Sequence, residues 1–97
     1  MSAFVVATVS IKDDQKFSEY ANAAGPTIAA KGGSVLKRGK FNGALAGASD
    51  HSSVAVIEFP NGEAITDWYN SDAYQAIIPL RDEACDMTLV TYNAPPA

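Results

Sequence analysis

Apolar side chains occupy both alternating sets of positions in the strand-like segments of this chain. In residues 4–11 and 53–59, one set comprises Val5, Ala7, Val9, Ala55, Ile57 and Phe59, and the intervening set includes Phe4, Val6, Val54 and Val56. Side chains of a strand alternate between the two faces of its sheet, so both faces need cover. Leaving each Val or Phe in water costs about 1.5–3 kcal/mol. The pattern favours a sheet with helices on one face and a further partner on the other.

A helical pattern follows the first strand. Asp13 and Asp14 supply N-capping chemistry, and the next apolar residues recur at helical spacing: Phe17, Tyr20, Ala21, Ala24 and Ile28. Gly25-Pro26 falls inside this pattern and predicts a kink or a break. Gly32-Gly33 predicts the end of the helix, because glycine tolerates a left-handed cap.

The remaining segments complete an alternating order. Strands are predicted at residues 34–39, 53–59 and 87–92, and residues 40–52 form a long connection that projects or extends the second strand. Pro60-Asn61-Gly62 turns into a helix, and Ser71 caps another that Pro79 must bend or split. The order β-α-β-β-α-β predicts an α+β, ferredoxin-like fold with a four-stranded antiparallel sheet. Because the helices cover one face, we expect the face with Val6, Val54 and Val56 to form a homodimer.

Composition limits the class of protein. The 97 residues fit a single domain, 1–97, and 7 Lys+Arg against 11 Asp+Glu give a net charge of −4, which argues against nucleic acid as a partner. One cysteine and one histidine exclude the usual zinc sites, and one cysteine excludes an intrachain disulfide. The amino-terminal apolar run is too short to span a bilayer. We expect a soluble, cytoplasmic protein with no metal and no membrane partner.

Several motifs together resemble a known family. They are the string VIEFP at residues 56–60, Trp68-Tyr69, Ser71, Tyr74-Gln75, Arg81, Tyr20, Gly32-Gly33 and Arg38-Gly39. The chain resembles, over nearly its whole length, a family of small, mostly bacterial proteins catalogued as a domain of unknown function, number thirteen-thirty of that series. The resemblance implies the dimeric α/β-barrel superfamily, in which two ferredoxin-like sheets pack face to face. Pro79 departs from the family pattern, because it interrupts a segment that is typically one continuous helix.

The superfamily implied by this resemblance contains several activities. They include antibiotic-biosynthesis-type monooxygenases, haem-degrading oxygenases, muconolactone isomerases and stress-response proteins. Since a fold does not carry its chemistry with it, the resemblance fixes the architecture rather than a reaction.

Two residues are candidates for proton transfer. Glu58 is a carboxylate in an otherwise apolar strand, and it can act as a general acid/base at the floor of a pocket or as a structural carboxylate at a strand end or dimer contact. His51 lies in the polar loop 49–52, where proton transfer, axial haem ligation and an exposed histidine without a role all stay open.

Five further residues are candidates for binding a substrate. Tyr20, Trp68 and Tyr74 can line a pocket for a planar organic molecule, although helix–sheet packing explains such aromatics as well. Arg38, between two lysines, can attract an anionic ligand or be a solvated strand end. Arg81 or a backbone group is a better partner for Glu58 than Arg38, unless the partner subunit supplies one. The predicted pocket lies between helices and sheet.

We expect Tyr20 and Tyr74 to flank that pocket and Glu58, Arg38 or Arg81 to supply its polar groups. His51 is expected to lie at most at its rim. Cys85 is expected to be a buried, inert thiol.

No motif identifies a reaction. The sequence contains no nucleophile elbow, P-loop, dinucleotide fingerprint or metal-ligand spacing, and no cofactor is expected. The first hypothesis is a small homodimeric protein that acts as a cofactor-free small-molecule enzyme of the monooxygenase or isomerase type. The alternative is a non-catalytic ligand-binding or stress-related dimer. Haem binding, a third hypothesis, depends on His51 alone.

Overall fold

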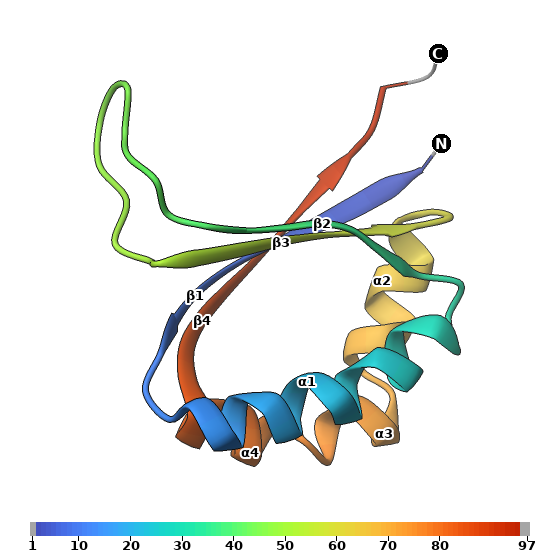
Figure 1. Ribbon diagram of the computed structural model, residues 1–97. Helices are drawn as coiled ribbons and strands as arrows, with labels where there is room; N and C mark the ends of the chain where they lie inside the picture. The colour runs from blue at the N-terminus through green and yellow to red at the C-terminus, as the bar shows by residue number, and fades with distance from the viewer. Residues whose placement is uncertain (1, 96–97) are drawn as a thin grey trace.

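One layer of helices lies against one face of a twisted sheet in the computed structural model, which describes residues 2–95 (Figure 1). The elements in chain order are β1 (Ala3–Ile11), α1 (Asp14–Ala29), β2 (Ser34–Lys40), β3 (Ser53–Phe59), α2 (Gly62–Tyr69), α3 (Asp72–Gln75), α4 (Ile78–Ala84) and β4 (Cys85–Asn93). The strand order is β2-β3-β1-β4, and each neighbouring pair is antiparallel. The predicted α+β, ferredoxin-like fold is confirmed.

Helix α1 begins as predicted but is not broken where a break was expected. The Asp13 carboxylate accepts a hydrogen bond from the Lys16 backbone N–H at 3.0 Å. The helix then continues from Asp14 to Ala29 with Pro26 inside it. A residue before proline is normally disfavoured in helical conformation because its Cβ meets the proline ring. Gly25 has no Cβ, so the predicted break does not occur.

Gly32 and Gly33 end α1 in a Schellman motif. Gly32 has a φ of 79°, its N–H donates to the Ala29 carbonyl at 3.0 Å, and the Gly33 N–H donates to the Ile28 carbonyl at 3.0 Å. Gly33 also lies against the core, because a Cβ there would be 2.7 Å from both Ile28 Cγ2 and Phe59 Cε2. The predicted helix end is confirmed, and close approach explains the second glycine.

Gly33→Ala is expected to lower the free energy of unfolding by about 2 kcal/mol, because the methyl group forces the core apart. Urea denaturation measures the change. Gly43→Ala is the control, since a Cβ at Gly43 would meet nothing within 4 Å, and we expect its effect to stay within about 0.5 kcal/mol. Equal losses in the two variants would contradict the close approach at Gly33.

Between β3 and β4 the chain forms three short helices. Pro79 lies in the first turn of α4, after a turn that separates this helix from α3, so the predicted split is confirmed. This position suits proline, whose missing N–H would have no helical partner there. Together with α1 these helices cover the sheet face that bears Val5 and Phe59, and Trp68 and Tyr74 fill the interlayer. Within residues 2–95, no helix combines the length and apolar character needed to cross a membrane.

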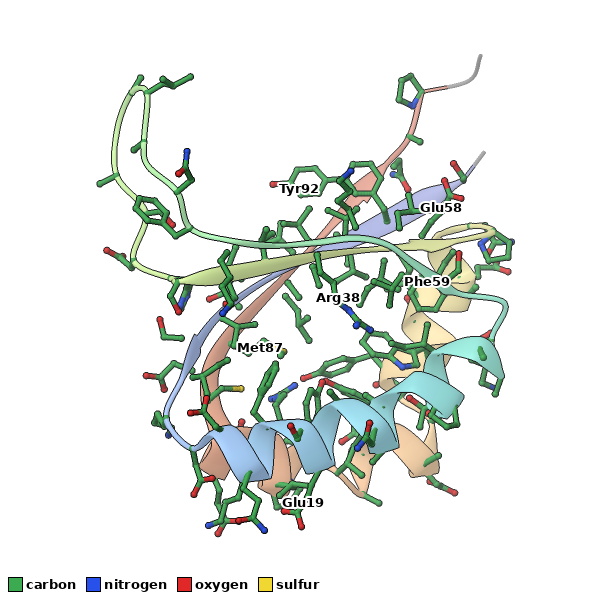
Figure 2. All side chains as sticks on the ribbon, in the orientation of Figure 1. Glu19, Arg38, Glu58, Phe59, Met87 and Tyr92 are labelled. Atoms are coloured by element: carbon green, nitrogen blue, oxygen red, sulfur yellow. The ribbon has the colours of Figure 1, made fainter. Side chains whose placement is uncertain are left out.

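The opposite, outer face of the sheet carries no helix. The register places Phe4 beside Tyr92, and Val6 between Val56 and Val90. Figure 2 shows Tyr92 and Glu58 on this side of the sheet, away from the helices. Val90 and Tyr92 are 41% and 49% exposed. The connection between β2 and β3 projects beyond the same side, as predicted (Figure 1). The outer face is therefore an uncovered apolar surface in the single chain.

Candidate functional site

A cavity of about 480 Å³ lies between α1 and the sheet, over β1, β2 and β3. Apolar side chains make most of its wall, among them Phe17 and Ala21 of α1 and Ala55 and Ile57 of β3. Ala21 is exposed, so the cavity opens to solvent. This volume falls within the range of about 300–1,000 Å³ that is typical of small-molecule pockets.

The polar groups of this cavity are few. They come from Tyr20 on α1, Arg38 and Lys40 on β2 and Ser53 on β3, and no Asp, Glu or His side chain lines it. Figure 2 shows Arg38 extending from β2 into the space between the sheet and the helices. The cavity therefore offers hydrogen-bond donors and positive charge, but no carboxylate or imidazole to act as a general base.

A β-bulge in β2 sets the direction of Arg38. Val35 pairs with Ile57, but the next paired residue, Lys37, lies opposite Val56, so Leu36 is an extra residue in the ladder. After this shift Arg38 pairs with Ala55, which faces the helices. The register cannot be read from the sequence, because a bulge moves every later side chain to the other face.

A chain of three hydrogen-bonded side chains reaches the cavity wall. Arg81 Nη1 donates to the Tyr74 hydroxyl at 3.1 Å, and the Tyr74 and Tyr20 hydroxyl oxygens are 2.8 Å apart. Tyr74 is fully buried, so its own proton needs an acceptor, and the Tyr20 oxygen provides it. Among the residues that the structure describes, the Tyr20 proton then has only the Met87 Sδ, 3.9 Å away, as a weak acceptor. A ligand oxygen would be a better one.

Burial and hydrogen bonding set the protonation states of Tyr20 and Arg81. Desolvation raises the pKa of Tyr20 well above its usual value, and the neighbouring Tyr74 raises it further. Desolvation alone would lower the pKa of Arg81, but hydrogen bonds to Tyr74 and Tyr69 outweigh it and the pKa is raised. Tyr20 is thus a neutral phenol and Arg81 a cation at physiological pH. Tyr20 can donate a hydrogen bond but cannot serve as a base.

At alkaline pH, the free energy of unfolding is expected to fall less in Tyr20→Phe than in the wild type. Because the Tyr20 pKa is raised in the folded state, the unfolded chain releases this proton first, at about pH 10. Stability from this group is present below that pH and declines above it, by at most about 1.4 kcal/mol per pH unit. Urea denaturation between about pH 8 and 11.5 measures the decline. Tyr92→Phe, on the outer face, is the control, and equal alkaline losses in wild type and Tyr20→Phe would contradict the shift.

A second cavity of about 400 Å³ lies on the other side of Trp68. It includes Tyr69, Arg81 and Thr91, and Trp68, Met87 and Leu89 line both cavities. Trp68 is 2% exposed, and its Nε1 donates to the Thr27 hydroxyl at 3.0 Å. Its indole ring is therefore both a core side chain and part of the wall between the two cavities.

The structure brings together four of the predicted site residues. Tyr74 is hydrogen-bonded to both Tyr20 and Arg81, and the Trp68 ring centroid is 4.4 Å from that of Tyr74. Arg38 faces the same interlayer from β2. Tyr74 is buried behind Tyr20 and does not line the first cavity itself. Met87 and Lys40 also line this cavity, and the helix-facing positions of β4 are the signal that could have identified Met87.

Of the two placements predicted for Glu58, the floor of the pocket is wrong, and a strand end is where it lies. Glu58 is exposed and lies on the outer face opposite Phe4, away from the cavity. Its position has the same parity as Val54 and Val56, which already pointed outward by strand alternation. The carboxylate that pairs with Arg81 is Asp82, at 3.3 Å, and not Glu58. A catalytic role for Glu58 stays a prediction, but it cannot act in this cavity within one subunit.

His51 is likewise absent from the cavity rim. Its Nδ1 is 3.0 Å from Ser10 Oγ and its Nε2 is 3.3 Å from Thr88 Oγ1. Ser10 and Thr88 occupy outward positions of β1 and β4, so the imidazole lies on the outer side. Phe4, beside Glu58, and Ser10, beside His51, are separated by about 20 Å along β1. The two candidates for proton transfer therefore do not form one site within the chain.

The thiol of Cys85 is buried, as predicted. Cys85 is 3% exposed, its Sγ donates to the Arg81 carbonyl at 3.3 Å, and burial raises its pKa. Across residues 2–95, no three His, Cys, Asp or Glu side chains gather in a way that could hold a metal ion.

Comparisons with known proteins identify a family and its fold. Residues 2–94 match the family described as "Domain of unknown function (DUF1330)". Among curated proteins, none matches this chain. A protein of unknown function from Rhodopseudomonas palustris is similar in structure, with a TM-score of 0.83, 19% identity, and coverage of 99% of this chain and 84% of that one.

Two further solved structures share the fold. SnoaB, a cofactor-independent oxygenase from Streptomyces nogalater, has a TM-score of 0.72 at 9% identity, covering 99% of this chain and 95% of that one. A dimeric protein of unknown function with a ferredoxin-like fold, from Bacteroides fragilis, has a TM-score of 0.55 at 12% identity, covering 96% of each chain.

Proposed function

This chain belongs to the DUF1330 family, whose description assigns no function, and from its cavity we propose that it is a homodimer that binds a small apolar organic molecule between α1 and the sheet of each subunit. The carrying observation is the apolar cavity of about 480 Å³, whose lining includes Tyr20 and Met87, with the Tyr20 hydroxyl 3.9 Å from the Met87 Sδ. An apolar wall with a few placed polar groups is typical of ligand pockets. Having one cysteine and no intrachain disulfide, the protein suits the reducing cytoplasm.

The outer face supports the dimer. It carries Phe4 stacked on Tyr92, with ring centroids 5.3 Å apart, and a central row of valines. A contiguous apolar surface of this kind is typical of an interface. A second copy is the occupant we propose, because two such sheets bury equivalent surfaces on each other. The Bacteroides fragilis relative is described as dimeric, which agrees with this proposal.

Tyr20 supports recognition of a ligand with an acceptor oxygen. Its hydroxyl accepts from Tyr74, and its proton is left with only a thioether as partner. A carbonyl or hydroxyl oxygen of a ligand would replace this weak contact with a stronger one. The two buried partners behind Tyr20 keep the donor in place before the ligand binds, which favours affinity.

A second candidate function is cofactor-free catalysis in the same cavity. The observation in its favour is the oriented Tyr20 donor, which could stabilise negative charge developing on a substrate oxygen. SnoaB is described as a cofactor-independent oxygenase, and an electron-rich phenol that releases its proton to solvent and binds as its anion could transfer an electron to oxygen without a base from the protein. Oxygen uptake with hydroquinone-type aromatics discriminates: uptake abolished by Tyr20→Phe supports catalysis, and binding without uptake supports the non-catalytic dimer.

Binding in the cavity can be measured through its own fluorophore. Trp68 is the only tryptophan of the chain and lines the cavity. We expect the neutral aromatic probe N-phenylnaphthylamine to quench Trp68 by energy transfer. Ala55→Phe, which places a ring in the cavity, is expected to weaken binding about tenfold or more, because it removes the apolar space that the probe fills.

Ala29→Phe is the matched control, since Ala29 is exposed and does not line the cavity. Circular dichroism checks that both variants fold. Equal affinities in Ala55→Phe and Ala29→Phe, or no binding to the wild type by any member of a panel of apolar aromatics, would overturn the proposed function.

A further inference from the structure

We propose that the cavity ligand is an amphipathic organic anion, an apolar body that carries one acid group, and that Arg38 and Lys40 bind the acid group at the β2 side of the cavity. The inference rests on the proposed function, because it names the ligand class of that same site. The observation behind it is that the charged side chains of the cavity lining are all positive.

The lining contains two cations and no carboxylate. Arg38 and Lys40 both belong to it, and no Asp or Glu does. Within residues 2–95 neither cation forms an ion pair, since the pairs present are Lys12–Asp86, Lys16–Glu83 and Arg81–Asp82. Both side chains are thus available to an anion, and the guanidinium can hold a carboxylate with two parallel hydrogen bonds.

The β-bulge at Leu36 is what brings both cations to the cavity. After the shift, Arg38 pairs with Ala55 and Lys40 with Ser53, and both partners line the cavity. An unbulged ladder continuing from Val35 would instead turn Lys37 and Gly39 to the helices. With the bulge, two cations, Arg38 and Lys40, face the helices. Without it, Lys37 would be the one cation of these positions to do so. Bulges often re-aim side chains beside functional sites.

The negative charge of the whole protein does not cancel this local attraction. The net charge is −4, but salt screens exposed charges beyond about 10 Å at 0.1 M ionic strength. An acid group bound at the β2 side of the cavity would interact mainly with Arg38 and Lys40, the charged residues of the cavity lining. Both side chains are exposed, so they can adjust to the ligand while its apolar body enters the cavity.

Two probes with nearly the same aromatic body separate charge from apolar binding. N-phenylnaphthylamine is neutral, and anilinonaphthalene sulfonate adds one negative charge. We expect the wild type to bind the sulfonate more tightly. The double variant Arg38→Gln/Lys40→Gln is expected to lose about tenfold in sulfonate affinity while its affinity for the neutral probe changes less than about twofold.

Lys37→Gln is the matched control, because it removes a neighbouring positive charge that the register places on the outer face opposite Val56. We expect it to leave sulfonate affinity within about twofold of the wild type. Ala55→Phe must weaken both probes, which assigns them to the cavity rather than to the outer face. Increasing the salt concentration should weaken the sulfonate and not the neutral probe.

The outcomes separate the two proposals. Neutral-probe binding that Ala55→Phe removes, with no preference for the sulfonate or an equal loss in Lys37→Gln, would overturn the anionic ligand class and leave the proposed function intact. Failure of both probes to bind, or binding insensitive to Ala55→Phe, would overturn the proposed function itself. A preference for the sulfonate that depends on Arg38 and Lys40 alone supports both.

Discussion

Val56→Asp is expected to dissociate the proposed homodimer into folded monomers or to prevent folding altogether. Val56 lies at the centre of the outer face, between Val6 of β1 and Lys37 of β2. A carboxylate there would be taken out of water into an apolar interface with only Lys37 beside it, and the desolvation of a buried charge, several kcal/mol per ion, is often not repaid by one ion pair. The dimer dissociation constant should therefore increase by more than about 100-fold. Sedimentation velocity at micromolar concentration measures the change.

Two further variants keep this prediction testable. Ala73→Asp introduces the same charge at an exposed position of α3 and is expected to leave the sedimentation coefficient unchanged. Tyr92→Asp places the charge at a half-exposed edge of the outer face and should dissociate the dimer even if Val56→Asp does not fold. A wild-type chain that sediments as a monomer, or a Val56→Asp dimer of unchanged stability, would show that the outer face is not the interface.

Trp68→Ala is expected to lower the free energy of unfolding by about 3–5 kcal/mol. The indole ring is buried between Phe59 and Tyr74, at centroid distances of 5.5 Å and 4.4 Å, and it donates to Thr27. Its removal leaves a void that joins the two cavities. Since domains are stable by about 5–15 kcal/mol, this loss is a large share of the total. Urea denaturation followed by circular dichroism measures it.

Trp68→Phe separates packing from hydrogen bonding. It keeps most of the apolar ring and loses the Nε1 donor, so we expect a loss of about 1–2 kcal/mol. Thr27→Val removes the acceptor of the Trp68 Nε1 together with the hydroxyl's own hydrogen bond to the Ala24 carbonyl at 2.6 Å, and should cost a similar amount, because the buried Nε1 is then unpaired. A loss below about 1 kcal/mol in Trp68→Ala would show that Trp68 does not support the wall between the cavities.

Strand alternation made the fold predictable. Val5 and Ile57 face the helices and Val6 and Val56 face outward, as the two apolar sets in the sequence required. Capping residues were equally informative, since Asp13 begins α1 and Gly32 ends it. In each of these places, one local physical rule decides the structure. Of the kink or break predicted at Gly25-Pro26, the break does not occur, because the glycine before the proline relieves the contact that normally ends a helix.

The candidate site was predictable only in part. Tyr20, Tyr74 and Arg81 were recognised as chemistry-bearing residues, but their hydrogen-bonded chain depends on tertiary packing between α1, α3 and α4. Glu58 was left open between a pocket floor and a strand end, and its strand parity, which it shares with Val54 and Val56, is the signal that would have placed it on the outer face. Arg38 could not be assigned to a face at all, since the bulge at Leu36 has no clear sequence signal and reverses the alternation after it.

Anomalous diffraction from crystals soaked with a bromonaphthol can locate the ligand site, because bromine marks the position of an apolar aromatic molecule without assuming its chemistry. If the cavity binds the ligand, a bromine peak is expected between α1 and β3, beside Phe17 and Ala55, with the naphthol oxygen within hydrogen-bonding distance of the Tyr20 hydroxyl. Bromine peaks confined to the outer face of the sheet, with the cavity filled only by solvent at saturating ligand, would rule out the cavity as the binding site.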